Sequence, residues 1–173
     1  KISFNVSGLT ETSTLTLNSG VVCNGAGDNT NYIFCIPEDI TVPVTNGFAE
    51  FNNIEIYEGV FVSENFTVDT SLFNQRYILD NSFIDTSTIK VKVKSSSTAT
   101  SSVTYKQIDN IVGVTSTSNS YLLQEIEDER YELIFGDNVI GRKLSNNNYI
   151  TASYIVTDGK DGNGASEFSF VGN

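Results

Sequence analysis

The densest group of residues that could do chemistry is acidic and lies between positions 125 and 132. Its members are Glu125, Glu127, Asp128, Glu129 and Glu132. Two carboxyl groups held about 5–10 Å apart across a cleft can hydrolyse a glycosidic bond. Here the cluster spans a predicted turn between two strands, where charged side chains are normally solvated. We therefore interpret it as a solvated turn, and a glycosidase stays a weaker alternative because the sequence indicates no cleft.

Two glycine-containing segments resemble ligand-binding loops without completing either motif. The segment 25–28 (Gly-Ala-Gly-Asp) lacks the Gly-Lys-Ser/Thr of a phosphate loop, and no helical pattern follows it. In the segment 158–164, Asp158, Asp161 and Asn163 do not have the spacing of an EF-hand calcium loop. We interpret the first segment as a loop and the second as a flexible glycine linker, and we predict no metal and no cofactor.

Histidine is absent from the chain. Its absence removes the commonest general base and the commonest transition-metal ligand, and it excludes a Ser-His or Cys-His catalytic pair. We therefore predict that the protein is not an enzyme and has no catalytic residues. Methionine is absent too, so we expect that Lys1 is not the natural start and that this is a piece of a longer protein.

The two cysteines, Cys23 and Cys35, are twelve positions apart. Two adjacent strands could bring them together, so a disulfide is possible on spacing. Two cysteines do not make the disulfide framework of a small secreted domain. We therefore favour two free, partly buried thiols.

The charge balance is acidic, with 10 basic and 21 acidic residues in 173, a formal net charge of −11. A nucleic-acid-binding protein needs a basic stripe, and the only regular group of cations, Lys90, Lys92 and Lys94, alternates along one predicted strand. We interpret these lysines as a solvated or edge-protecting face. No apolar segment is long enough to span a membrane. We predict no nucleic-acid, membrane or small-molecule partner.

The composition predicts strands rather than helices. Phe, Tyr, Thr, Val and Ile are frequent, and no long segment of helix-forming residues occurs. Asn46-Gly47 predicts a tight hairpin, and Pro43 indicates an open strand edge. The clearest alternation lies in 87–94, where Ile89, Val91 and Val93 oppose the lysines. The predicted strands are 2–6, 12–17, 21–23, 32–36, 40–44, 48–51, 54–57, 60–68, 76–79, 87–94, 103–107, 121–126, 131–135 and 149–156, with loops at 24–31 and 95–102.

This spacing predicts an all-β, mainly antiparallel fold of one or two small sandwich-like modules with at most short helical turns. We place the modules at 1–58 and 59–173, and the two can also pack as one. In the last third, Tyr131–Phe135 alternates, and Gly136, Asp137 and Asn138 tolerate the positive φ of a reversal. We therefore expect a hairpin-like unit around this corner, followed by the strand 149–156.

The same region resembles the baseplate wedge proteins of contractile-tailed phages, a group related to the baseplate J family. The resembling segments here are Phe135–Leu144 (FGDNVIGRKL), Tyr154–Gly159 (YIVTDG) and 162–164 (GNG). The family usually has a second glycine after Gly-Asp, where this chain has Asn138, and Asn also adopts left-handed geometry. Further resembling segments, in the family's order, are 32–34, 38–42, 46–48, 54–59, 74–79 and 84–91, so the resemblance covers most of residues 15–170.

The resemblance implies a structural subunit of the tail baseplate wedge, present in the virion and in the host cytoplasm during assembly. Its implied partners are other wedge subunits and copies of itself. Aromatic and Arg side chains concentrate interface energy, so the candidate contact residues are Gly136, Asp137, Asn138, Arg142, Lys143, Tyr149 and Tyr154. For each of them, core packing or turn formation is the alternative.

The surplus of Asn, Ser, Thr and Tyr supports a second hypothesis, a glycan-binding or adhesive β-sandwich at a virion or cell surface. That hypothesis predicts a shallow, aromatic-lined groove and a measurable affinity for sugars.

Overall fold

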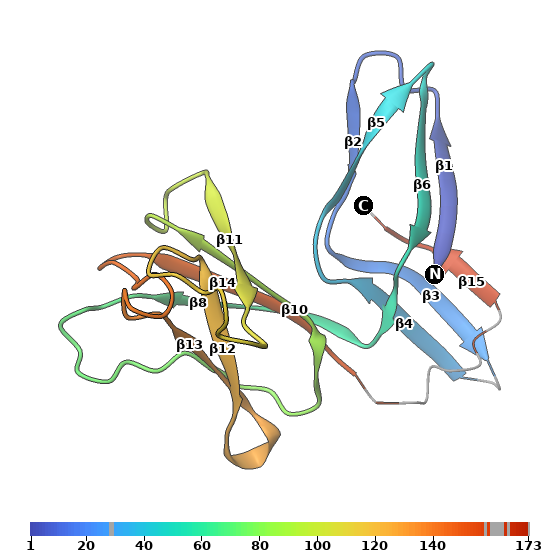
Figure 1. Cartoon of the computed structure of the whole chain (residues 1–173). Helices are drawn as coiled ribbons and strands as arrows, with labels where there is room; N and C mark the ends of the chain where they lie inside the picture. The colour runs from blue at the N-terminus through green and yellow to red at the C-terminus, as the bar shows by residue number, and fades with distance from the viewer. Residues whose placement is uncertain (28–29, 158, 160–164, 166, 173) are drawn as a thin grey trace. The chain divides into compact units, whose positions relative to one another are not determined.

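The computed structural model describes residues 1–27, 30–157, 159, 165 and 167–172, and its regular structure is almost entirely β-strand (Figure 1). The elements are β1 (Ile2–Ser7), β2 (Thr14–Leu17), β3 (Gly20–Gly27), β4 (Thr30–Ile36), β5 (Ile40–Thr45), β6 (Phe48–Ile54), β7 (Tyr57–Glu58), β8 (Val60–Thr67), β9 (Ile78–Leu79), β10 (Ile84–Lys94), β11 (Ser102–Gln107), β12 (Ser120–Glu125), the 3-10 turn η1 (Glu127–Glu129), β13 (Tyr131–Phe135), β14 (Tyr149–Val156) and β15 (Glu167–Phe170). The predicted all-β, mainly antiparallel class is confirmed.

The chain forms two compact units. Unit 1 contains Lys1–Phe61 and Ile155–Asn173, and unit 2 contains Val62–Tyr154, so the boundary passes through β8 and β14. The sequence assigned all of 59–173 to a second module. In the structure the C-terminal segment belongs to unit 1 instead, because β15 pairs antiparallel with β3.

Unit 1 has two four-stranded sheets, ordered β1-β6-β5-β2 and β15-β3-β4-β7. Its core contains Leu17, Val22, Ile36, Ala49, Phe51 and Ile54. The predicted Asn46-Gly47 hairpin is confirmed: both residues have positive φ, 53° and 80°, and Thr45 pairs with Phe48. These angles match the tight turn whose twist suits two antiparallel strands.

The expected loop at 24–31 is mostly strand. β3 and β4 stay in antiparallel register as far as Gly27 and Thr30. A Cβ at Gly25 would lie 2.6 Å from the Phe34 ring and 3.1 Å from the Phe168 ring. Glycine at this position therefore lets the rings of Phe34 and Phe168, whose centroids lie 5.4 Å apart, pack over the strand. The loop prediction was wrong here because this glycine serves packing and not a turn.

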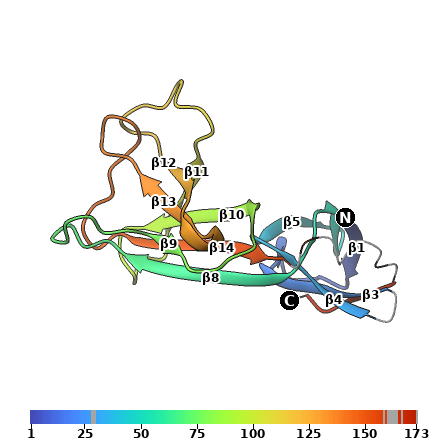
Figure 2. The ribbon, with the colours of Figure 1, turned by 90° about the horizontal axis from the view of Figure 1, so that it is seen from below.

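Unit 2 is one seven-stranded sheet, ordered β8-β14-β10-β11-β12-β13-β9. Figure 2 shows its long strands β8, β14 and β10 alongside one another. On β10 the aliphatic residues Ile89, Val91 and Val93 are buried, which confirms the predicted alternation, whereas the alternating lysines, predicted as a solvated or edge-protecting face, are half-buried. Because β10 lies between β14 and β11, its lysine face does not protect an edge.

The hairpin expected around Gly136 does not form. β13 pairs with β12 and with β9, which fill its two edges, while β14 lies between β8 and β10. Residues 136–148 are therefore an irregular connection between strands that are not neighbours in the sheet. The two strands predicted on either side of the acidic turn, 121–126 and 131–135, form an antiparallel hairpin, with Tyr121 opposite Phe135.

Candidate contact surface

The loop that follows β13 is folded tightly onto itself at two glycines. A Cβ on Gly136 would lie 2.1 Å from the carbonyl carbon of Gly141, a distance that no real side chain tolerates. Gly141 itself has a φ of 80°. Two stretches of backbone therefore touch at this point, and only glycine fits at position 136.

Between the two glycines, side chains cap the backbone. Asp137 Oδ1 accepts hydrogen bonds from the N–H groups of Ile140 at 3.0 Å and Val139 at 2.8 Å. These bonds stabilise the carboxylate and lower the pKa of Asp137. Asn138 has a φ of 72°, and its Oδ1 accepts from the N–H of Lys143 at 3.0 Å. The left-handed geometry predicted for Asn138 is therefore confirmed.

A second loop is fastened to the first. The N–H of Gly141 donates to the carbonyl of Thr115 at 3.1 Å, and the N–H of Arg142 donates to the carbonyl of Ser118 at 2.8 Å. Within the second loop the N–H of Thr115 donates to Ser118 Oγ at 3.0 Å. We call residues 108–119 and 136–144 together the paired loops.

The paired loops expose aliphatic side chains from both segments. Val112 is 83% exposed and Val139 72% exposed, and Ile111 and Ile140 are also exposed. Because large exposed apolar patches can mark protein contacts, these aliphatic side chains are candidate contact residues. Sequence reasoning missed Ile111 and Val112; their signal was an adjacent aliphatic pair in an otherwise polar, turn-like segment.

A cavity of about 320 Å³ adjoins the 136–144 loop. Its lining residues include Leu133, Phe135 and Tyr77, together with the charged residues Lys143 and Asp69. The turn that carries Asp69 also carries Phe73, whose ring is 94% exposed. The cavity and this turn extend the candidate surface within unit 2.

The structure divides the residues predicted for contact into two groups. Asp137, Asn138, Arg142 and Lys143 are exposed on the loop, while Gly136 is half-buried and shapes its backbone. Tyr149 is partly exposed on β14. Tyr154 is fully buried, so its prediction as a contact anchor is corrected: β14 turns this side chain into unit 2.

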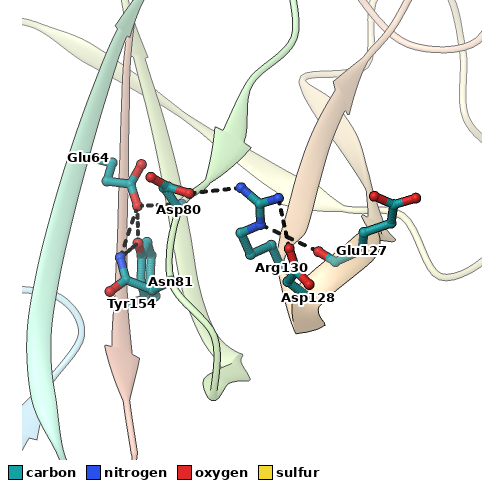
Figure 3. A network of polar contacts seen from close by, with 7 residues as sticks. All are labelled: Glu64, Asp80, Asn81, Glu127, Asp128, Arg130 and Tyr154. Atoms are coloured by element: carbon teal, nitrogen blue, oxygen red, sulfur yellow. Dashed lines mark hydrogen bonds and ion pairs between the residues drawn. The ribbon is translucent and has the colours of Figure 1, made fainter.

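The Tyr154 hydroxyl belongs to a polar network, shown in Figure 3. It donates to Glu64 and accepts from Asn81 Nδ2 at 2.9 Å. Glu64 also accepts from the N–H of Asp80 at 3.0 Å. Burial, together with the bond to Glu64, raises the pKa of Tyr154. This side chain joins β14 and β8 to the turn at 80–81.

Two of the five acidic residues, Asp128 and Glu132, form ion pairs with arginines. Glu125 and Glu127 line a cavity of about 380 Å³ together with Arg76 and Arg130. Arg130 binds Asp80 at 3.0 Å and Asp128 at 3.5 Å. Glu132 pairs with Arg76 at 2.6 Å. Within the described part of the chain, no group of three or more acidic, Cys or His residues could hold a metal ion.

Cys23 and Cys35 are both free and buried, in line with the expectation of free thiols. Desolvation raises the pKa of each thiol, and Cys35 Sγ donates to the carbonyl of Gly59 at 3.3 Å. Buried thiols with raised pKa values are poor nucleophiles.

Two predictions on the glycine segments concern residues outside the described part of the chain. Asp28, and the segment 158–164 apart from Gly159, lie outside the described residues. The described part of the chain contains no helix long and apolar enough to cross a membrane.

In comparisons with known proteins, no protein-family model and no curated protein matches the chain.

Proposed function

We propose that this chain is a structural part of a phage tail baseplate wedge and that the paired loops contact neighbouring wedge subunits or further copies of the chain. The observation that carries the proposal is the exposed aliphatic surface on a backbone fixed by Gly136, Gly141 and the bonds to Thr115 and Ser118. A rigid apolar surface loses little conformational entropy when a partner covers it.

The resemblance to the baseplate wedge family suggests which proteins the paired loops would contact, namely other wedge subunits and copies of this chain. The segment Phe135–Leu144, one of those that resemble the wedge family, also carries Val139, Ile140 and Arg142 to the surface. Pairing between the described strands provides a rigid framework, and loops on such a framework commonly carry the binding residues. This arrangement supports a scaffold role.

The test is a capture experiment with the whole chain as bait in lysate of cells infected by the virus that encodes it, read by mass spectrometry. Three baits are compared: the natural chain, Arg142→Glu, and Lys92→Glu as a matched charge reversal on β10, outside the paired loops. We expect the natural chain and Lys92→Glu to recover tail and baseplate proteins. Arg142→Glu should recover at least about tenfold less, equivalent to roughly 1.4 kcal/mol of binding free energy.

Two outcomes contradict the proposal in different ways. If Arg142→Glu captures the same baseplate proteins in the same amount, the paired loops are not the contact. If the natural chain captures no tail protein, the wedge assignment itself is wrong.

A further inference from the structure

β5 and β6 of unit 1 separate shortly after their turn. Their register is limited to Thr45 with Phe48 and Val44 with Ala49, after which β5 continues as the partner of β2. β6 pairs with β1 on its other edge, from Phe48 to Ile54. A gap therefore opens between two strands that began as one hairpin.

Pro43 explains why the hairpin opens where it does. The N–H of Val44 donates to the carbonyl of Ser13 at 2.9 Å, toward β2. Because successive N–H groups of a strand point to opposite sides, the nitrogen of residue 43 faces β6. Proline has no N–H to donate. The open edge that the sequence predicted at Pro43 thus lies on the β6 side of β5.

A groove of about 610 Å³ lies at this separation. Its lining includes Pro43, Thr45, Asn46, Phe48, Glu50 and Asn52. The Phe48 ring is 52% exposed. The tight turn fixes one end of the groove, and the N–H of Leu9 donates to the carbonyl of Gly47 at 3.2 Å. The turn and this bond fix the backbone at one end of the groove, and exposed side chains of β5 and β6 line it.

The lining residues indicate the chemistry of the occupant. Neither Lys nor Arg is among them, and Glu50 adds negative charge, so an anionic ligand is disfavoured. The apolar lining residues are Val42, Pro43 and Phe48, and Phe48 supplies the one aromatic ring. Amide, hydroxyl and carboxylate groups surround that ring and offer both donors and acceptors.

A neutral sugar ring has this same combination of surfaces. One face of a pyranose is a patch of C–H groups that stacks on an aromatic ring, while its rim carries hydroxyls that both donate and accept. We propose that the groove between β5 and β6 binds a neutral oligosaccharide, with Phe48 as the stacking surface and Asn46, Glu50 and Asn52 as hydrogen-bonding partners.

The strands beside the groove support an occupant longer than one sugar. Thr14 and Thr16 of β2, Thr41 of β5 and Asn5 of β1 are all exposed, and Thr16 and Thr41 share a hydrogen bond of 2.8 Å between their hydroxyls. Uncharged hydroxyl and amide groups thus continue the polar surface on both sides. The inference is independent of the paired loops, because every residue it uses lies in unit 1.

The test is a titration of the whole ¹⁵N-labelled chain, followed by amide shifts. The probes are cellotriose, maltotriose, triacetylchitotriose and, as an anionic sugar, sialyllactose. We expect saturable shifts confined to residues around 42–52 for at least one neutral trisaccharide, and binding of sialyllactose at least about tenfold weaker. Phe48→Ala should weaken the neutral sugar about tenfold, Glu50→Gln severalfold, and Phe73→Ala, an exposed Phe of unit 2, not at all.

The spectrum of Phe48→Ala outside the groove must match that of the natural chain, so that loss of binding is not loss of folding. Three results would overturn the inference: no saturable shift with any neutral probe up to about 20 mM, shifts that map away from the groove, or an unchanged affinity in Phe48→Ala. If the occupant of the groove is instead an extended peptide that pairs with β6, no neutral sugar should give a saturable shift.

Discussion

Single residues set the shape of the 136–144 loop. Gly136 lets two backbone stretches touch, Asn138 holds a positive φ of 72°, and Asp137 caps two N–H groups. Each of these roles is local, so each can be removed without disturbing the sheet. The exposed Val139 and Ile140 depend on all three for their position.

Gly136→Ala should lower the free energy of unfolding by about 2–3 kcal/mol, because the new methyl group meets the backbone of Gly141. Gly113→Ala is the matched control. Gly113 has a φ of 88° but open space around it, so its substitution should cost only about 1 kcal/mol. Urea unfolding followed by circular dichroism measures both. Equal losses in the two variants would show that the close approach at Gly136 does not exist.

Asp137 should titrate below the ordinary pKa of an aspartate. Hydrogen bonds from Ile140 and Val139 lower its pKa in the folded state. A lowered folded pKa means that the group stabilises the fold above the ordinary pKa and that this contribution is lost as pH falls through the lower, folded value. A carbon-13 titration of the carboxyl group measures it, and Asp137→Asn should remove this part of the acid sensitivity. A pKa at or above the ordinary value would contradict the capping geometry.

At the scale of elements, the features predicted correctly are those that depend on residues close together in the sequence. Asn46-Gly47 located a hairpin because its turn geometry is local. The alternation of Ile89, Val91 and Val93 located the buried face of β10 for the same reason.

Pairing between distant strands could not be predicted in this way. Nothing in Tyr149–Val156 specifies that its neighbours are β8 and β10, so the sequence favoured a hairpin with β13 that does not form. β15 was not predicted at all, because its four residues are exposed and their order comes from pairing with β3. Of the candidate site, the segment Gly136–Leu144 was proposed from the sequence as a contact segment, although its loop structure was not predicted. Ile111 and Val112 join it only through the long-range bonds to Thr115 and Ser118.

Tyr154→Phe should lower the free energy of unfolding by about 1–2 kcal/mol. The change removes a buried hydroxyl that bonds Glu64 and Asn81, and it leaves the Glu64 carboxylate one donor short. Tyr149→Phe, on the same strand but partly exposed, should stay within about 0.5 kcal/mol of the natural chain. Chemical denaturation of both variants decides the matter, and no difference between them would count against a network that joins β14, β8 and the 80–81 turn.

At the scale of the whole molecule, the two units carry surfaces of different chemistry. Unit 2 carries the aliphatic surface that we propose contacts another protein. Unit 1 carries the groove that we propose binds a sugar, lined by one aromatic ring and one carboxylate and by neither Lys nor Arg. The capture experiment and the sugar titration address separate residues. Failure of one therefore leaves the other standing.

The central claim, a wedge subunit that uses the paired loops for contact, is tested most directly by cryo-electron microscopy of the virion that contains this chain. The account predicts density for both units within the tail baseplate, with Val112, Val139 and Arg142 covered by a neighbouring subunit. A chain located outside the baseplate, or paired loops that face solvent in every copy, would contradict it.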